Sequence, residues 1–479
     1  MITQIEIDGF KTFKDFKVEL APFQVIVGPN GSGKSNLFDA LHLLSRLATD
    51  DIASAFQVLR GRDYEQFTAL PNGKYTDRIR IAVEMLVDRK VQDDLGDHAE
   101  LTYTRLRYQL EVSIRTNGRG MERFYVTHES LAPIFQEEDN WSEKYGISSQ
   151  ESWIPKLTVE EQHYKKLGQA ELLIHTINVS DNSEGHTLIT LFSERPIENK
   201  DSSRRFKAES MQRTVLSSVN DISYYHAFAA REELRSLKFL HLNPKALREP
   251  SSVKAPKNLS SDGGNLPTTL ARMQAEDKFA LKDVSRDMAN LVPGILDIEI
   301  DEDKARAQYI VQAKTANQRT FSSQVLSDGT LRLLALATLG NDPQFHGILC
   351  LEEPENGVHP FGLKNMARLL RKMATDFNDP EQVNEPLRQV LVTTHSPAFI
   401  SQPGVLNSLL FAYIVTQIVP EQPTLDVTRM VPVIPEKNQL PFLEEADINK
   451  AEASYTLDEV KKYLDNEAMH EALLHFSER

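Results

Sequence analysis

The stretch Phe23-Gln-Val-Ile-Val-Gly-Pro-Asn-Gly-Ser-Gly-Lys-Ser35 decides the fold class of this chain. It opens with a short apolar run that predicts a buried strand, and it continues in a loop with the spacing G-x-x-x-x-G-K-S. Glycines at this spacing let backbone N–H groups converge on phosphate oxygens, while Lys34 can reach the β- and γ-phosphates and the Ser35 hydroxyl can bind Mg²⁺. Leu37 and Leu41 follow at helical spacing, so the loop would open a helix whose positive N-terminus faces the anion. This order predicts an α/β fold with a site for nucleotide phosphates.

A second segment supplies the acidic groups that a Mg²⁺–nucleotide site requires. Ile348-Leu-Cys-Leu351 is an apolar run, typical of a buried strand, and it ends in Glu352 and Glu353. One of two such carboxylates can hold the metal while its neighbour polarises the attacking water. Cys350 is then a buried strand residue, which argues against a catalytic thiol.

Two further segments place polar residues at the ends of apolar runs. Leu326-Ser-Asp-Gly-Thr330 precedes a leucine-rich helical run, and a serine and a glycine at a helix N-terminus favour anion binding. Gln389-Val-Leu-Val-Thr-Thr-His-Ser396 is predicted to be a strand that ends at His395. A lone histidine is more often structural. This one follows the acidic strand by one βα unit, however, and we expect its strand end to lie beside the phosphate site.

The composition is that of an ordinary globular protein. Of the 479 residues, 40% are hydrophobic and 26% are charged, which excludes general disorder. The length fits one large domain with insertions, or two to three units. A single cysteine excludes an internal disulfide and a cysteine-based zinc site, and it indicates a reducing cytosol. The sequence has no run of 18 apolar residues and no visible secretory signal, so we expect a cytoplasmic chain without a membrane partner.

The charge balance leaves DNA open as a partner. A net charge of −15 favours solubility and does not attract nucleic acid over the whole surface. A local basic groove is compatible with this balance, because charges act over roughly 10 Å at moderate salt. Arg204, Arg205 and Lys207 form a small basic cluster, for which a solvated loop is favoured over a nucleic-acid contact.

The residue pattern divides the chain into four stretches, which are 1–90, 91–210, 211–435 and 436–479. In the first, alternating apolar residues from Ile79 to Val87 predict a strand that is antiparallel to a second one near residues 106–114, with one face in water. The stretch 91–210 is an inserted β-rich or α+β region, and its lack of sustained heptads argues against a coiled-coil arm.

The third and fourth stretches contain more helix. The pattern is helical and then βα-like through residues 211–435, and Leu234, Leu237 and Leu240 share one face of a predicted helix. The acidic tail 436–479 is also predicted to be helical. There Thr456-Leu-Asp-Glu459 matches a capping box at a helix N-terminus.

Taken in order, these motifs resemble the ABC-type ATPases of the RecF/SMC branch, and more closely the OLD-like ATPases with E-E-P-E. The resemblance covers residues 1–90 and roughly 211–415. It includes the family opening, Gly9-Phe-Lys-Thr-Phe13, the segments Leu242-Asn-Pro-Lys-Ala-Leu-Arg248 and Gly263-Gly-Asn-Leu266, and the motifs given above. It implies an ABC-type P-loop ATPase head formed by 1–90 and 211–435, with an antiparallel β lobe.

The resemblance also implies roles for individual residues. Walker A would bind ATP through Asn30, Gly31, Ser32, Gly33, Lys34, Ser35 and Asn36. Ser35 and Glu352 would hold Mg²⁺, and Glu353 and His395 would be the catalytic base and the switch histidine. Glu355 and Asn356 would belong to the D-loop. The Q-loop glutamine has three candidates, which are Gln57, Gln66 and Gln212.

In this family the signature of one subunit covers the nucleotide on the Walker A of another. Ser327, Asp328 and Gly329 would therefore contact ATP held by a second copy of the chain, with Asp328 replacing the glycine of the transporters. This implies an ATP-dependent head-to-tail dimer or an assembly of such dimers.

Three functions stay open under this resemblance. No TOPRIM nuclease motif is seen after the ATPase part, which argues against a nuclease in the same chain. The lack of a coiled coil and the acidic charge favour the first function, an ATPase sensor that acts with a separate effector, as in anti-phage systems such as PARIS or Septu. The second is an ATPase of DNA repair or chromosome maintenance. The third is a nucleotide-locked scaffold with little turnover.

Overall fold

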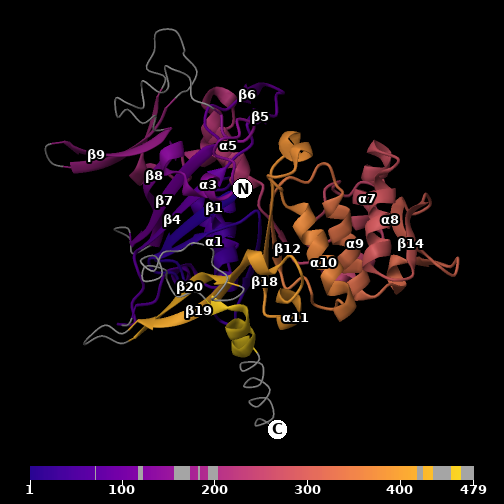
Figure 1. Ribbon diagram of the computed structural model, residues 1–479. Coiled ribbons are helices and arrows are strands. Elements are labelled where there is room, and N and C mark those ends of the chain that lie inside the picture. Colours follow the sequence, from indigo (N-terminus) through magenta and orange to yellow (C-terminus); the bar gives the residue numbers. More distant parts are fainter. Residues whose placement is uncertain are drawn as a thin grey trace.

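The computed structural model describes residues 1–70, 72–116, 122–155, 173–181, 184–192, 203–417, 424–434 and 455–464 (Figure 1). Two large sheets stand on either side of one helix, and a lobe of helices with a small sheet lies beside them. The fold class is α/β, as predicted. Among the described residues, no helix has the length and the apolar character needed to cross a membrane.

The central sheet carries the phosphate-loop strand in its interior. Its order is β12 (Lys238–Leu240), β17 (Gly347–Glu352), β18 (Arg388–Thr394), β3 (Phe23–Val27), β19 (Leu409–Gln417), β20 (Leu425–Ile434) and β21 (Tyr455–Thr456). The first five strands are parallel, and β20 runs antiparallel to β19. The apolar strands β3, β17 and β18 are buried on both faces, as parallel strands between covering layers must be.

The second sheet is antiparallel and has eight strands. Its order is β11 (Arg204–Lys207), β10 (Glu184–Leu191), β9 (Ile174–Asp181), β8 (Glu122–Pro133), β7 (Arg105–Thr116), β4 (Arg78–Leu86), β1 (Ile2–Asp8) and β2 (Phe16–Glu19). The predicted antiparallel pair is confirmed as β4 and β7. Because these two strands pair across residue 90, the boundary proposed there falls inside one sheet. A separate hairpin joins β5 (Lys90–Gln92) to β6 (His98–Glu100).

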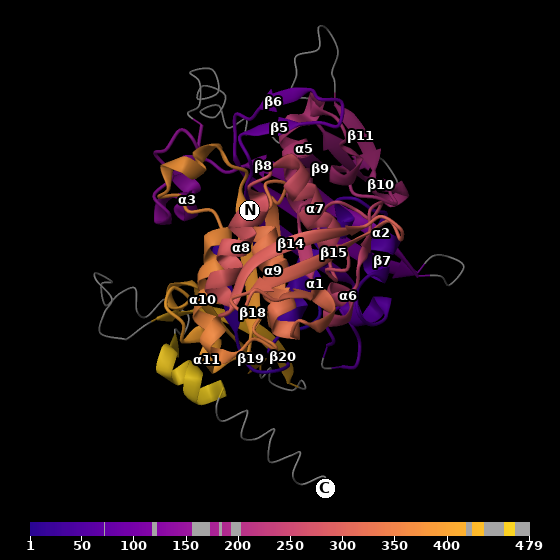
Figure 2. The same cartoon turned by 90° about the vertical axis from the view of Figure 1, so that its right-hand side faces the viewer.

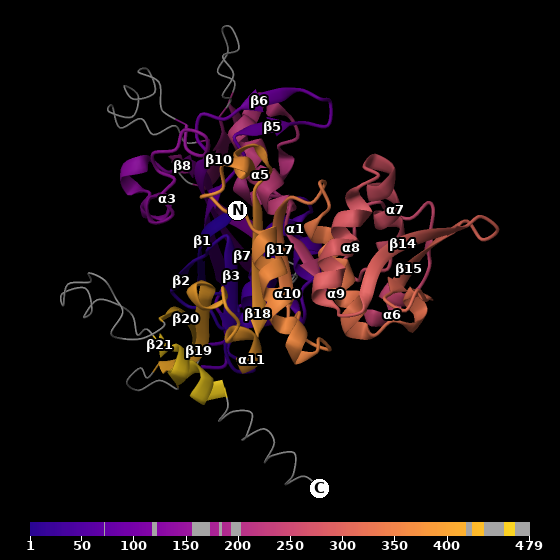
Figure 3. The ribbon, with the colours of Figure 1, turned by 45° about the vertical axis from the view of Figure 1, so that its right-hand side comes forward.

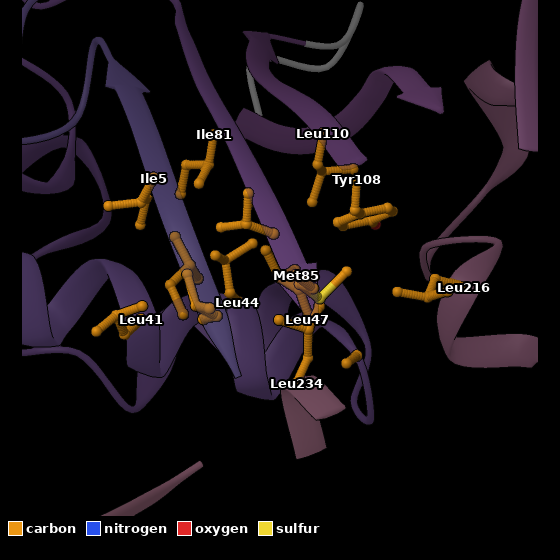
Figure 4. Close-up of a cluster of buried hydrophobic side chains, with 14 of the residues drawn as sticks. Ile5, Leu41, Leu44, Leu47, Ile81, Met85, Tyr108, Leu110, Leu216 and Leu234 are labelled. Atoms are coloured by element: carbon orange, nitrogen blue, oxygen red, sulfur yellow. The ribbon is translucent and has the colours of Figure 1, made fainter. Parts of the chain in front are cut away.

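Helix α1 (Lys34–Leu47) fills the space between the two sheets. Figure 4 shows Leu41 and Leu44 of this helix close to Ile5 and Ile81 of the antiparallel sheet. All four side chains are buried. Burial of one such side chain contributes roughly 1.5–3 kcal/mol, so this contact holds the phosphate loop at a fixed place between the sheets.

The helical lobe covers the opposite side of the central sheet (Figures 2 and 3). Helices α9 (Asp328–Gly340) and α10 (Pro360–Met373) share a hydrophobic core with one face of β3, β17 and β18. Farther out lie α6 (Pro244–Arg248), α7 (Leu266–Glu276), α8 (Ala280–Leu291) and a small sheet of β13 (Ser251–Ser252), β14 (Ile295–Asp303), β15 (Gln308–Thr315) and β16 (Thr320–Ser322).

Short elements complete the fold. Further α-helices in the described residues include α2 (Ile52–Gln57), α3 (Asn140–Lys144), α5 (Tyr225–Arg235) and α11 (Pro397–Ile400). The 3₁₀ turns are η1 (Asp63–Gln66), η2 (Gln136–Glu138), η3 (Ala208–Ser210), η4 (Leu216–Ser218), η5 (Ile222–Tyr224), η6 (Ser323–Val325), η7 (Pro380–Asn384) and η8 (Leu406–Ser408).

Two local predictions have opposite outcomes. The helix predicted across Leu234, Leu237 and Leu240 is wrong, because α5 ends at Arg235 and Leu240 belongs to strand β12, which pairs with β17. The capping box is confirmed, since the Thr456 N–H donates to the Glu459 carboxylate over 2.8 Å and the Glu459 N–H donates to Thr456 Oγ1 over 3.3 Å. Residues 457–464 are helical, and the rest of the predicted helical tail lies outside the described residues.

One buried carboxyl joins the antiparallel sheet to the connection before α5. Glu129 on β8 accepts hydrogen bonds from Tyr108 Oη (3.0 Å), the Val215 N–H (2.7 Å) and the Leu216 N–H (2.8 Å). In the same connection, Thr214 Oγ1 donates to the Leu47 carbonyl at the end of α1. Burial raises the pKa of Glu129 from 4.5 to about 7, although the hydrogen bonds act in the opposite direction.

This shift predicts a pH-dependent stability. The folded-state pKa lies above the unfolded one, so the contribution of Glu129 is fully present below pH 4.5 and is lost as the pH rises through about 7. We expect the free energy of unfolding of the wild type, relative to Glu129→Gln, to fall by about 3 kcal/mol between pH 4.5 and 8. Denaturant titrations of both proteins across this range measure the difference. Parallel pH profiles would contradict the prediction.

Candidate nucleotide-binding site

The phosphate loop joins β3 to α1 and closes around its own lysine. Lys34 Nζ donates to the carbonyls of Gly28 and Pro29, both over 2.6 Å, and its side chain is only 8% exposed. Gly33 precedes the helix with a φ of +96°, and a Cβ atom there would collide with Thr428 Oγ1. Only glycine suits this position, because it tolerates the left-handed backbone and lacks the atom that would clash.

Two threonines from distant parts of the chain support the loop from behind. Thr12 Oγ1 and Thr428 Oγ1 are 2.7 Å apart, and Asn36 Nδ2 donates to Thr12 Oγ1 over 2.9 Å. Thr428 Oγ1 also donates to the Ser32 carbonyl over 3.2 Å. The predicted site residue Asn36 therefore positions the loop as well as facing the cleft. Thr12 lies in the predicted family opening, but no sequence motif marks Thr428.

The strand register brings the predicted site residues to one edge of the central sheet. Thr394 of β18 pairs with Val27 of β3, and Thr393 pairs with Glu352 of β17. The phosphate loop and the two acidic residues therefore face the same cleft, as predicted from the order of the strands.

This cleft has a volume of about 500 Å³. Its lining residues are Asn30, Gly31, Gly33, Lys34, Ser35, Asn36, Leu240, His241, Leu242, Arg332, Leu336, Leu351, Glu352, Glu353, Pro354, Asn356 and Thr393. Six of the seven predicted Walker A residues are among them. The exception is Ser32, whose buried hydroxyl has no hydrogen-bond partner among the described residues.

Glu353 is held in place from three sides. His395 Nδ1 lies 2.7 Å from Glu353 Oε1, Asn356 Nδ2 donates to Oε2 over 2.7 Å, and the Glu353 N–H donates to the Thr393 carbonyl over 2.9 Å. The residue has a φ of +46°, a backbone conformation that costs energy for a side chain of this size. Its carboxylate is thus fixed in position by the predicted switch histidine and by a D-loop residue.

The neighbouring acid and thiol have different surroundings. Glu355 is buried and bonded to Thr394 Oγ1, and it does not line the cleft. Burial raises its pKa, and the Glu353 carboxylate raises it further. Burial likewise raises the pKa of Cys350 well above its ordinary value, which agrees with its assignment as an inert strand residue.

The signature segment lies outside the cleft formed by its own chain. Ser327 is the N-cap of α9, and its Oγ accepts the Thr330 N–H over 3.2 Å. The helix begins at Asp328, two residues earlier than the predicted start near Thr330. Ser327, Asp328 and Gly329 are not among the residues that line the cleft, whereas Arg332 from the next turn is. Ser327 and Asp328 are exposed to solvent.

The donor set fits a magnesium nucleotide. Gly31 has a φ of +78° and open space where a side chain would be, so backbone and anion can approach closely there. Ser35 and Glu352 both line this cleft. Among the described residues, no cluster of three or more His, Cys, Asp and Glu side chains could hold a metal. Mg²⁺ usually binds through one or two protein groups together with substrate phosphates, and Ser35 and Glu352 can supply two such groups.

Other predicted candidates lie elsewhere. Gln57, Gln66 and Gln212 are absent from the cleft lining, and Gln66 Nε2 donates to the Arg60 carbonyl over 2.8 Å. His241 lines the cleft at the exit from β12 to the helical lobe. The basic cluster is part of the edge strand β11 rather than a loop, and Arg204 lies over the Tyr224 ring at 5.4 Å.

Comparisons with curated proteins find short similar segments. One segment of 88 residues is 39% identical to "Chromosome partition protein Smc" of Synechococcus sp. and covers 18% of this chain and 7% of that protein. Another, of 135 residues, is 34% identical to the protein of the same name from Bordetella petrii and covers 27% of this chain and 10% of that protein. The matches thus span a tenth or less of these relatives.

Comparison with solved structures finds SMC heads. "Crystal structure of the SmcHead bound to the C-winged helix domain of ScpA" is 14% identical with a TM-score of 0.44, covering 90% of this chain and 96% of that chain. The SMC head with a coiled coil and joint from Pyrococcus yayanosii is 11% identical with a TM-score of 0.42, covering 98% of this chain and 99% of that chain.

A protein family matches most of the chain. Its description is "AAA domain, putative AbiEii toxin, Type IV TA system", and the match covers residues 23–401. This range includes the phosphate loop, the signature segment, the acidic strand and His395, whose order was the basis of the resemblance. The chain therefore belongs to this AAA family.

Proposed function

We propose that this chain hydrolyses ATP to ADP and phosphate with Mg²⁺, at sites shared between two copies of itself. One observation carries the proposal. The phosphate loop and Glu353 face one cleft, whereas the signature serine is exposed outside it at the start of a helix. A second copy can bring that serine to the cleft, and the first copy cannot do so without rearrangement.

The polar residues at the cleft have roles that follow from their chemistry. Lys34 and the loop N–H groups bind the phosphates, and Ser35 and Glu352 would hold Mg²⁺, which would supply positive charge to the phosphate oxygens. Glu353 accepts the proton of the attacking water. His395 and Asn356 position that carboxylate through the hydrogen bonds described above, so both act on the reaction through Glu353.

The surface beside the signature supports assembly of two chains. Val325 directly precedes the signature and is 66% exposed, and Phe321, five residues before the signature, is 38% exposed. Apolar side chains at such a position are suited to burial against a partner. At the same place Ser327 and the N-terminus of α9 offer a hydroxyl and a helix dipole to phosphate.

The biological role that we propose is that of the ATPase subunit of an anti-phage defence system, acting with a separate effector such as a nuclease. The support is the family description, which refers to a toxin of a toxin–antitoxin system. A role in DNA repair or chromosome maintenance is the alternative, favoured by the Smc segments and by the basic residues on β11. ATP turnover with and without double-stranded DNA distinguishes the two, since a DNA-repair ATPase should be stimulated by DNA.

Mixing two inactive variants tests the shared sites. Ser327→Arg places a bulky side chain at the signature but leaves Lys34 intact, so it should bind ATP without hydrolysing it. Lys34→Ala should not bind ATP. A mixed dimer then has one site with both lesions and one site with neither.

We expect measurable turnover when these two variants are mixed, up to about half of the wild-type value per mixed dimer. Two separately inactive chains can regain activity in this way only if each site uses residues from both chains. A confirmed mixed dimer without turnover would contradict independent shared sites. If the variants do not associate in ATP at all, the head-to-tail arrangement itself is wrong.

A further inference from the structure

A single arginine contacts the signature loop at three points. Arg248 is the last residue of α6, and its Nη1 donates to the carbonyls of Leu326 (2.5 Å) and Gln324 (3.1 Å). Its Nη2 bonds to the carboxylate of Asp328. In return, Ser323 Oγ donates to the Arg248 carbonyl over 2.9 Å. The guanidinium group and the carbonyl of Arg248 thus both bond to the segment that leads into α9.

The carboxylate in this cluster poses an electrostatic problem. Asp328 follows Ser327 directly and is 55% exposed, so its negative charge lies where the proposed function brings the phosphates of a partner's ATP. Like charges that approach closely repel each other, and the repulsion grows as the interface excludes water. An acidic residue in the signature therefore requires a positive charge in contact with it.

The geometry identifies Arg248 as that positive charge. Its ion pair with Asp328 is direct, and its two bonds to backbone carbonyls fix the guanidinium behind the loop. The two carbonyls accept hydrogen bonds from Nη1 and the carboxylate accepts from Nη2, so both terminal nitrogens of the guanidinium bond within the same chain. A lysine has one charged nitrogen and cannot reproduce this planar, forked arrangement.

We propose that Arg248 is a positioning residue of the shared ATP site, which cancels the charge of Asp328 so that the signature can accept the partner's γ-phosphate. The inference rests on the proposed head-to-tail function and deepens it. Arg248 acts on the nucleotide of the other chain, not on the nucleotide bound by its own phosphate loop.

The first test measures kcat and ATP affinity in a set of variants. Arg248→Ala should lower kcat by about tenfold or more and weaken ATP-dependent association, because an uncompensated carboxylate then faces phosphate. Binding of a fluorescent ATP analogue to the isolated chain should stay within about twofold of wild type, because Lys34 is untouched. This binding also shows that the variant is folded. Arg286→Ala is the matched control, because it removes an arginine that forms an intrahelical ion pair with Asp283 in the same lobe.

Removing the negative charge of Asp328 should restore the activity that Arg248→Ala loses. Asp328→Asn in the Arg248→Ala background should restore kcat at least tenfold towards the wild-type value, because no negative charge remains to be cancelled. Arg248→Lys should fall between wild type and Arg248→Ala, since it keeps the charge without the fork. If the double variant is as slow as Arg248→Ala, charge compensation is not the role of Arg248 and the proposal is overturned.

The second test locates the site on which Arg248 acts. Arg248→Ala mixed with Lys34→Ala should recover turnover, because both lesions then fall on the same shared site. Ser327→Arg mixed with Lys34→Ala is run beside it and tests the shared sites alone. Recovery in both mixtures supports the inference, and recovery only in the Ser327→Arg mixture overturns it while the proposed function stands. If neither mixture recovers, the shared-site function fails, and the inference fails with it.

Discussion

Lys34→Ala is expected to abolish ATP binding. The Lys34 ammonium group is buried within the phosphate loop, where it donates to the Gly28 and Pro29 carbonyls. Removing it leaves the phosphate charge without its counter-ion, which should weaken ATP affinity by roughly 10²-fold or more. Titration with a fluorescent ATP analogue measures this loss directly.

The matched control for this variant is Lys17→Ala. Lys17 lies on the antiparallel sheet, is 62% exposed and pairs with Glu6. Its removal changes the net charge by the same amount, and we expect ATP affinity to stay within about twofold of wild type because exposed ion pairs contribute little. Normal affinity in Lys34→Ala would mean that the loop is not the phosphate site.

Glu353→Gln is expected to bind ATP normally and to hydrolyse it about 10²- to 10⁴-fold more slowly. The amide keeps the size of the side chain, so the contact with Asn356 and the shape of the cleft should persist. It cannot accept the proton of the attacking water, however. Single-turnover hydrolysis at saturating ATP separates this loss of chemistry from any change in binding.

A control and an alternative accompany this prediction. Glu19→Gln removes an exposed carboxylate of the antiparallel sheet that pairs with Lys144 of α3, and it should leave turnover unchanged. If Glu353→Gln turns over like wild type, the base must be another group. His395 is then the first candidate, because its Nδ1 lies 2.7 Å from Glu353 and at the same strand edge.

The sequence was sufficient to predict which residues meet around the cleft because the relevant signals are local. A phosphate loop requires a fixed spacing of glycines, lysine and serine, and a parallel strand that ends in Glu352 and Glu353 must deliver them to the same edge as β3. His395 follows from the same argument on β18. In each case one short segment of sequence identifies the functional residue and also predicts where it lies in the sheet.

The features that the sequence did not predict depend on contacts between residues that are far apart in the chain. Thr428 supports the phosphate loop from β20, 416 residues from its partner Thr12, and no local pattern distinguishes it from any strand threonine. Leu240 lies at helical spacing from Leu237, but pairing of β12 with β17 outweighs that local preference. Pairing between β4 and β7 across residue 90 likewise joins strands that lie far apart in the chain.

The most direct test of the shared-site account is the mass of Glu353→Gln in solution, measured by light scattering with and without ATP and Mg²⁺. This variant should retain ATP, so the account predicts that its mass doubles, or reaches an even multiple, when ATP is added. A chain that carries both Glu353→Gln and Ser327→Arg should keep the mass of the unassociated protein when ATP is added, although it still binds ATP. An unchanged mass of Glu353→Gln at saturating ATP would contradict the account.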